Sequence, residues 1–139
     1  MKPTLQAGIG TKRSYRVDRE RTIDFLGENA RVYATPMMVR DIELTCREFL
    51  LAHLDAGEDT VGTRVEVDHL GATLMGMTVE VSVKAVEVKG RAVTFEVEVH
   101  DGLEKVGQGR HARFVVDVKK TEERLKAKGQ KAREAGKLA

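Results

Sequence analysis

Three polar residues depart from the pattern of their surroundings. Glu43 lies within an apolar helical stripe, His69 occupies the inward phase of an alternating strand, and Thr35 stands at the start of the same helix. A carboxylate and an imidazole that face one helix–sheet interface form a natural general acid/base pair. A hydroxyl at the positive end of a helix lies where developing negative charge is stabilised. The three residues therefore indicate a site for acid–base chemistry.

Each of these residues also has a structural interpretation. Glu43 could lie at the edge of the stripe and pair with an arginine, because an unpaired carboxylate costs several kcal/mol to bury. His69 could be a hydrogen-bonded core residue, and Thr35 could be only a helix N-cap. On an ideal helix, Thr35 and Glu43 are about 80° apart around the axis and roughly 12 Å apart along it. A substrate group could lie between them, and direct contact is not expected.

The helix that positions Thr35 and Glu43 is predicted over residues 36–55. Thr35 followed by Pro36 is a favourable start, with Thr35 as N-cap, and Gly57 supplies a stop. Its apolar stripe consists of Val39, Ile42, Cys46, Phe49, Leu50 and His53. Four charged residues are placed outside that stripe: Arg40, Asp41, Arg47 and Glu48.

Period-two patterns after this helix predict long strands. The inward rows are Thr63, Val65, Val67 and His69; Met77, Val79, Val81, Val83 and Ala85; Val93, Phe95, Val97 and Val99; and Ala112, Phe114, Val116 and Val118. Residues 11–17 add a further strand, and Lys89-Gly90 and Asp101-Gly102 are tight-turn signals. Strands joined by hairpins form an antiparallel sheet, and the only helix available to cover it is 36–55. The predicted fold class is α+β, with a curved sheet of about five strands wrapped around one central helix.

Length and composition limit the possible classes of protein. The 139 residues suit one domain, with 41% hydrophobic and 33% charged residues. Cys46 is the only cysteine, which excludes an internal disulfide and a cysteine-based zinc cluster, and the four histidines lack metal-ligand spacing. We expect neither a metal nor a cofactor. No apolar run is long enough to cross a membrane, and the N-terminus lacks a signal-peptide core, so a cytoplasmic location without membrane binding is expected. Few Asn and Gln residues among many charges suggest a heat-adapted source.

The C-terminal segment has a charge of its own. Residues 119–139 contain eight Lys/Arg and three Asp/Glu, a net charge of +5, which leaves −3 for residues 1–118. We therefore expect a domain over residues 1–118 followed by a charged, helical or frayed tail over residues 119–139. Aromatic residues that could stack on bases are absent from the tail, so nucleic acid is not the expected partner. Nearby, Gly107-Gln-Gly109-Arg-His111-Ala-Arg113 suits either close approach to a phosphate or a strand bulge with a basic rim.

At these residues the sequence resembles the fluoroacetyl-CoA thioesterase group of hot-dog-fold proteins. Val32-Tyr-Ala-Thr35-Pro-Met-Met-Val39, followed by Glu43, is similar to the helix start of that group. Gly62-Thr63-Arg-Val-Glu-Val-Asp-His69-Leu-Gly-Ala-Thr73 is similar to its histidine-bearing strand. The segments around Val99–Gly102 and Gly107–Arg113, and the charged tail, also match in order. The resemblance covers nearly the whole chain.

The resemblance implies a hot-dog homodimer that hydrolyses a small acyl-CoA to the free acid and CoA. It assigns the catalytic set to Thr35, Glu43 and His69, and it places Gly62 and Arg113 along the acyl or CoA end of the site. It leaves open whether Glu43 is a nucleophile or a base that activates water. Upstream of the helix, the segment that begins at Phe25 is shorter than the phenylalanine-bearing lid of the fluoroacetyl enzyme, so the acyl group is not specified.

Other classes of function remain as alternatives. A non-catalytic domain that binds acyl-CoA or another small ligand would keep the glycines and Arg113, and it would not need Glu43 and His69 together. A hydratase or dehydratase of the same fold would add water to an enoyl-CoA and release no thiol. A nucleic-acid binder would use the tail and would depend steeply on salt.

Overall fold

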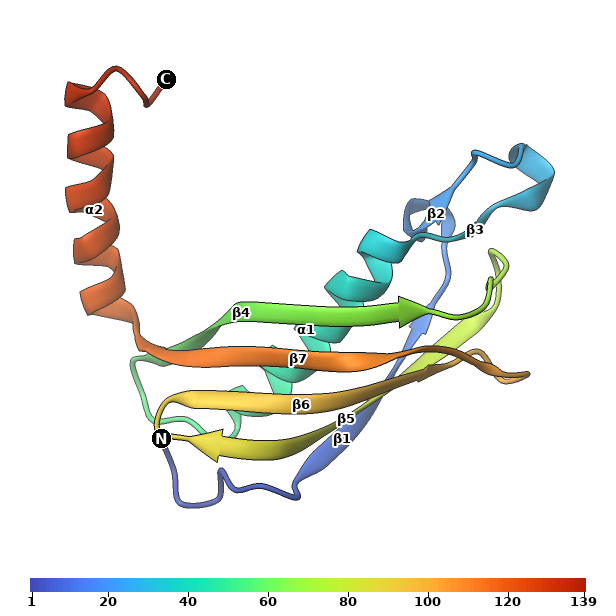
Figure 1. The fold of residues 1–139 in the computed structure, drawn as a ribbon, viewed down its shortest axis with the longest axis horizontal. Coiled ribbons are helices and arrows are strands. Elements are labelled where there is room, and N and C mark those ends of the chain that lie inside the picture. Colours follow the sequence, from blue (N-terminus) through green and yellow to red (C-terminus); the bar gives the residue numbers. More distant parts are fainter.

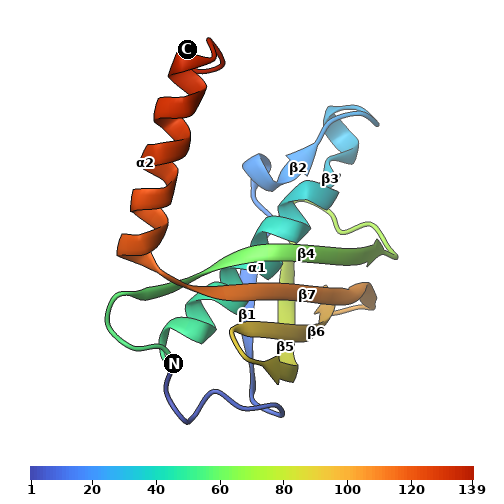
Figure 2. The ribbon, with the colours of Figure 1, turned by 60° about the vertical axis from the view of Figure 1, so that its left-hand side comes forward.

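A single long helix packs across one face of an antiparallel sheet (Figures 1 and 2). The computed structural model describes residues 1–139. The helix is α1 (Thr35–Leu51), and the sheet has five strands in the order β1-β5-β6-β7-β4. These strands are β1 (Gly10–Arg16), β5 (Thr78–Lys89), β6 (Ala92–His100), β7 (Lys105–Asp117) and β4 (Glu58–His69). This arrangement confirms the predicted α+β architecture.

Shorter elements precede α1, and one helix follows the sheet. The short elements are η1 (Arg19–Arg21), β2 (Thr22–Ile23), η2 (Glu28–Ala30) and β3 (Val32–Tyr33), with β2 and β3 paired in a small second sheet. The C-terminal helix is α2 (Val118–Glu134), which has no buried residue. Neither α1 nor α2 has the length and apolar character of a membrane-spanning helix.

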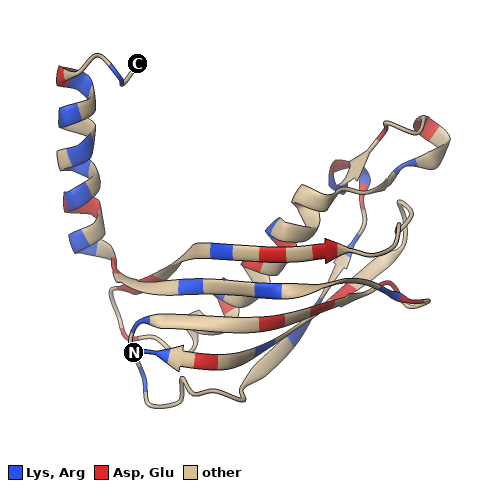
Figure 3. Cartoon of the chain, in the orientation of Figure 1, with Lys and Arg blue, Asp and Glu red and all other residues tan.

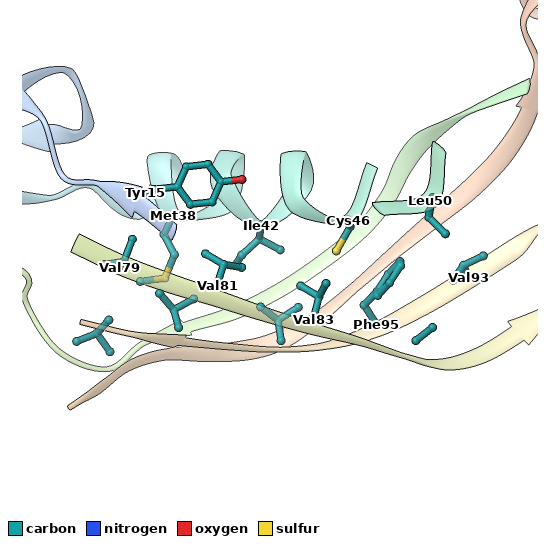
Figure 4. Packing of buried hydrophobic residues seen from close by; sticks show 14 of the residues in the cluster. Tyr15, Met38, Ile42, Cys46, Leu50, Val79, Val81, Val83, Val93 and Phe95 are labelled. Atoms are coloured by element: carbon teal, nitrogen blue, oxygen red, sulfur yellow. The ribbon is translucent and has the colours of Figure 1, made fainter. Parts of the chain in front are cut away.

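The core lies between α1 and the concave face of the sheet (Figure 4). Met38, Ile42, Cys46 and Leu50 recur at helical spacing and are fully buried. They face alternate residues of β5 and β6, among them Val79, Val81, Val83, Val93 and Phe95. Burial raises the pKa of the Cys46 thiol to about 12. As predicted, Cys46 is a small core residue.

The boundaries and burial of α1 differ from the prediction in three ways. The N-cap is Ala34, so Thr35 is the first helical residue and its hydroxyl caps nothing. The helix ends at Leu51, four residues before the predicted end at 55, because the chain turns at Ala52. Asp41, which was placed outside the stripe, is fully buried.

The predicted inward row of β7 is wrong by one residue. The buried side chains are His111, Arg113 and Val115, whereas the side chain of Phe114 is 42% exposed. An apolar row was expected to face the helix. The structure instead turns two polar side chains inward, where other residues of the site satisfy their hydrogen bonds. A one-residue shift in phase exchanges the two faces of a strand.

Candidate active site

Thr35 and His69 meet at the N-terminal end of α1. The Thr35 hydroxyl and His69 Nδ1 are 2.8 Å apart, within hydrogen-bond distance. Thr35 begins α1, and His69 is the last residue of β4. No acidic residue lies in the first turn of α1, so the positive end of the helix dipole is not neutralised there. This end of the helix can therefore stabilise negative charge that develops beside the pair.

The second ring nitrogen of His69 is buried and unpartnered. Nε2 has no hydrogen-bond partner, although it is shielded from solvent. Burial lowers the pKa of His69, and the Gly71 backbone opposes this shift without giving Nε2 a partner. Such a nitrogen is available to a substrate atom or a water molecule.

Glu43 lies two turns further along α1, beside a buried arginine. Arg113 Nη1 is 3.3 Å from Glu43 Oε2, and the side chains are 5% and 45% exposed, respectively. The other nitrogens of Arg113 donate to the Thr60 hydroxyl at 2.8 Å and to the Thr60 carbonyl at 2.9 Å. The bonds to Thr60 thus fix the position of the guanidinium, and the guanidinium in turn holds the half-exposed carboxylate of Glu43.

His111 supports Arg113 from the neighbouring inward position. Its Nδ1 is 2.8 Å from the carbonyl oxygen of Arg64, to which only a protonated Nδ1 can donate. Nε2 then accepts from Arg113 Nη1 at 3.1 Å. Burial lowers the pKa of His111, and the charge of Arg113 acts in the same direction. His111 is therefore a neutral acceptor that orients the guanidinium.

Gly62 leaves room for this carboxylate. A Cβ atom at position 62 would lie 2.9 Å from Glu43 Oε2, 3.2 Å from His111 Cε1 and 3.4 Å from Arg113 Nη1. Gly62 pairs with Arg113 across the strands, and the β4–β7 register shifts just after it. A side chain here would push the carboxylate of Glu43 away from Arg113, so glycine keeps this close approach open.

A buried ion pair ties the segment before α1 to the helix itself. Asp41 is fully buried and accepts two hydrogen bonds from Arg21, at 2.9 Å and 3.0 Å. The Tyr33 hydroxyl donates to the same carboxylate at 2.6 Å. Burial, followed by the hydrogen bond to Asp41, raises the pKa of Tyr33 far above its ordinary value. Because Tyr33 is two residues before Thr35, this cluster fixes the chain as it enters the site.

The predicted site residues fall into two groups along one α1–β4 seam. Thr35 and His69 form one group, and Glu43, Gly62 and Arg113 form the other. Glu43 and His69 were expected to face one helix–sheet interface as an acid/base pair, but no hydrogen bond joins them. The pairing of Glu43 with an arginine also matches the structural interpretation of that residue.

The segment upstream of the helix does not close over the site. Phe25 is its only phenylalanine, and the side chain is 83% exposed. The segment is anchored instead by ion pairs of Glu28 with Arg19 and with Arg31. In this structure no phenylalanine of this segment covers the acyl end of the site.

Two residues of the site were not predicted from the sequence. His111 appeared only within a glycine- and arginine-rich segment, and Asp41 was assigned to the solvated face of the helix. The signal for His111 was its place in a series of alternate residues with Arg113 and Val115, which puts all three on one face of a strand. For Asp41 no local signal existed, because its partners Arg21 and Tyr33 come from outside the helix. The structure has no group of three or more His, Cys, Asp or Glu that could hold a metal ion.

Known proteins match this chain over most of its length. A family model described as fluoroacetyl-CoA-specific thioesterase matches residues 17–119. A fluoroacetyl-CoA thioesterase from Streptantibioticus cattleyicolor is 30% identical over 135 residues, which cover 92% of this chain and 97% of that protein. The crystal structure of a mutant fluoroacetyl-CoA-specific thioesterase has a TM-score of 0.83 and 30% identity, covering 91% of this chain and 99% of the other.

Two further solved structures extend this comparison. A Thermus thermophilus protein described as a thioesterase superfamily member has a TM-score of 0.87 and 30% identity, over 95% of this chain and 98% of its own. A hot-dog-like protein from Thermanaerovibrio acidaminovorans has a TM-score of 0.81 at 22% identity, over 91% of this chain and 93% of its own. The predicted hot-dog arrangement is confirmed.

Proposed function

The chain belongs to the fluoroacetyl-CoA-specific thioesterase family, and from this premise we propose that it hydrolyses a small acyl-CoA at the Thr35–Glu43–His69 site. Its activity is acyl-CoA thioester hydrolysis, which gives a free acid and CoA. The observation that carries the assignment of the site is the Thr35–His69 hydrogen bond at the N-terminus of α1, with Glu43 further along the same seam. A lone free cysteine suits a reducing compartment, so we place the enzyme in the cytoplasm.

The proposed reaction uses Glu43 as the base and His69 as a hydrogen-bond donor. Glu43 removes a proton from water as the oxygen attacks the thioester carbonyl, and the positive end of α1 stabilises the oxyanion. When the carbon–sulfur bond breaks, His69 Nε2–H donates a hydrogen bond to the CoA sulfur. The proton held by Glu43 then passes through water to that sulfur. The balance is one thioester and one water consumed, and one acid and one thiol formed.

In this scheme Thr35 and Arg113 prepare the two reacting residues. A hydroxyl proton donated by Thr35 to Nδ1 of His69 places the remaining imidazole proton on Nε2. Arg113 positions the carboxylate of Glu43 by a hydrogen bond, and Gly62 has no side chain that would displace this carboxylate. The nitrogens of Arg113 already donate to Thr60, Glu43 and His111. Its direct contact with CoA stays a prediction.

Release of free CoA is the direct test of the function. The purified protein should liberate thiol from at least one member of a panel that contains acetyl-, fluoroacetyl-, propionyl-, isobutyryl- and benzoyl-CoA. Binding of every member without thiol release would instead support the acyl-CoA-binding alternative. Consumption of an enoyl-CoA without thiol release would support a hydratase.

The dependence of hydrolysis on pH should follow His69. Protonation of Nδ1 would turn an acceptor into a donor and reverse the bond from Thr35, so activity requires the neutral ring. Since burial lowers the pKa of His69, the acidic limb of kcat/KM should have its midpoint below the ordinary histidine value of about 6.5. The profile of kcat/KM against pH measures this midpoint. A midpoint above that value would contradict the assignment.

We propose that the enzyme is a homodimer joined through β4. This strand is at the edge of the sheet and is twelve residues long, whereas the opposite edge strand, β1, has seven. An open edge of this length is a template for pairing with another strand. Val61 and Val65 lie along it and are 45% and 43% exposed. Antiparallel pairing of two β4 strands about a two-fold axis would satisfy both edges.

Light scattering tests the dimer. At micromolar concentration the protein should have about twice the chain mass of 15.4 kDa. Val65→Asp adds a charge to the proposed seam and should shift the protein toward monomer. Leu103→Asp serves as its control, because Leu103 is 86% exposed on a loop outside β4 and this variant should stay dimeric. A wild-type protein with the mass of one chain would exclude the proposal.

A further inference from the structure

The C-terminal helix α2 stands apart from the sheet from which it emerges. Asp117 caps its first turn by accepting from the Lys120 backbone at 2.9 Å, and Val118 N donates to the Gly57 carbonyl at 2.9 Å. This second bond anchors the base of α2 beside the start of β4. From there α2 projects past β4, away from the other strands (Figures 1 and 2). A well-capped helix of 17 residues is thus directed into the space beyond the open edge of the sheet.

The length of α2 and its exposed apolar side chains suit packing against the sheet of a second subunit. Seventeen residues span roughly 25 Å, which is about the width of five strands at ~4.8 Å spacing. Its base lies against Phe114 and Val116, which point away from α1, so α2 is on the outer side of the sheet. One face of α2 carries Val118 and Leu125, 45% and 62% exposed, with Gly129 in line. Neither side chain is buried within its own chain.

α2 is basic, whereas the strands carry charges of both signs, with acidic residues gathered in one hollow of the outer face (Figure 3). Within residues 118–134 there are seven Lys/Arg and three Glu. A hollow on the outer face is lined by four carboxylates and one guanidinium, from Glu66, Asp68, Glu96, Glu98 and Arg110. Glu66 and Asp68 lie near the end of β4, while α2 is anchored near its beginning.

We propose that α2 is an arm that lies across the outer face of the partner subunit's sheet and packs its Val118–Leu125 face there. The inference rests on the proposed β4–β4 homodimer. Antiparallel pairing places the end of one β4 beside the start of the other, so the acidic hollow of one copy lies next to the base of the other copy's arm. By the two-fold symmetry each dimer contains this contact twice.

Exchange of subunits between isotopically labelled and unlabelled dimers, followed by native mass spectrometry, tests the arm. Lys128→Glu with Arg133→Glu reverses two charges that flank the Val118–Leu125 face, and neither residue has an ion-pair partner in its own chain. Four attractive contacts per dimer would become repulsive, so exchange should be roughly tenfold faster. The matched control, Lys120→Glu with Lys131→Glu, reverses two charges on the opposite face and should exchange like wild type.

Charge reversal on the sheet should compensate. Glu96→Lys with Glu98→Lys lies on β6, outside the β4 seam, and should restore slow exchange when combined with Lys128→Glu and Arg133→Glu. Unchanged exchange in the arm variant, or acceleration that the sheet variant does not reverse, would overturn the arm. So would binding of random duplex DNA that these arm substitutions abolish while exchange stays unchanged. CoA release is measured separately, so a failure of the thioesterase assignment remains distinct from a failure of the arm.

Discussion

Replacing Glu43 by Gln, or His69 by Ala, should each lower kcat by about 10²–10⁴-fold, the usual contribution of a positioned acid or base. Gln keeps the shape of Glu43 but accepts no proton from water, and Ala at 69 removes the hydrogen-bond donor to the leaving sulfur. Since both residues serve one reaction cycle, the double variant should lose little more than either single variant. CoA release under substrate saturation measures these losses.

Matched control variants distinguish the loss of a catalytic group from a general effect of substitution on the protein. Glu48→Gln removes a carboxylate from an exposed turn of the same helix, and His100→Ala removes an exposed imidazole; both should keep wild-type kcat. Thr35→Ser should retain activity, because only the hydroxyl contacts His69, and Thr35→Ala should lose it. Near-wild-type hydrolysis by a folded Glu43→Gln/His69→Ala double variant would show that both residues are structural.

Replacing Asp41 by Ala should produce the largest loss of stability. Arg21 and Tyr33 would be left without their shared buried acceptor, and removing one partner of a buried pair costs about 3–5 kcal/mol. Denaturant unfolding, with the midpoint and slope both fitted, gives the change in the free energy of unfolding. Asp24→Asn is the control, because its ion pair with Arg31 is long, at 3.8 Å, and Asp24 is 64% exposed. That variant should change the free energy by less than about 1 kcal/mol.

The Asp41 variant also tests how the site is held. Tyr33 leads directly into α1 through Ala34, so freeing it should loosen Thr35 and lower kcat in protein that is still folded. Replacing all three partners by apolar residues of similar size, as Asp41→Leu, Arg21→Met and Tyr33→Phe, should recover much of the stability. A loss below about 1 kcal/mol for Asp41→Ala would mean that this buried pair does little to hold the segment.

Local sequence patterns predicted the frame of the molecule better than its polar interior. The helical stripe through Ile42, Cys46 and Leu50 and the alternation through Val79–Val83 follow from periodicity alone, and both are confirmed. The prediction of the inward row of β7 was wrong because Arg113 forms hydrogen bonds with His111 and Glu43, which allows polar side chains to face inward. A rule that places only apolar residues inside cannot predict this. The prediction that Asp41 lies outside the buried stripe was wrong for the same reason, since its hydrogen-bond partners lie 20 and 8 residues away in the chain.

The candidate site was recognised because its residues broke the pattern. Glu43 and His69 were singled out as polar exceptions, and Thr35 by its place at the start of a helix. Their distribution into two groups could not be read from spacing, because it depends on where β4 crosses α1. The catalytic roles of these residues stay predictions until the variants are measured.

The burial of Cys46 has a consequence for an enzyme whose product is a thiol. Each turnover releases CoA, and oxidised CoA exchanges readily with any exposed thiolate to form a mixed disulfide. The only cysteine of this chain is buried, and its thiol has a pKa raised to about 12, so almost no thiolate exists at neutral pH. The folded enzyme therefore resists forming a mixed disulfide with the oxidised form of its product. The same property makes Ellman-type thiol reagents count released CoA without background from the folded protein.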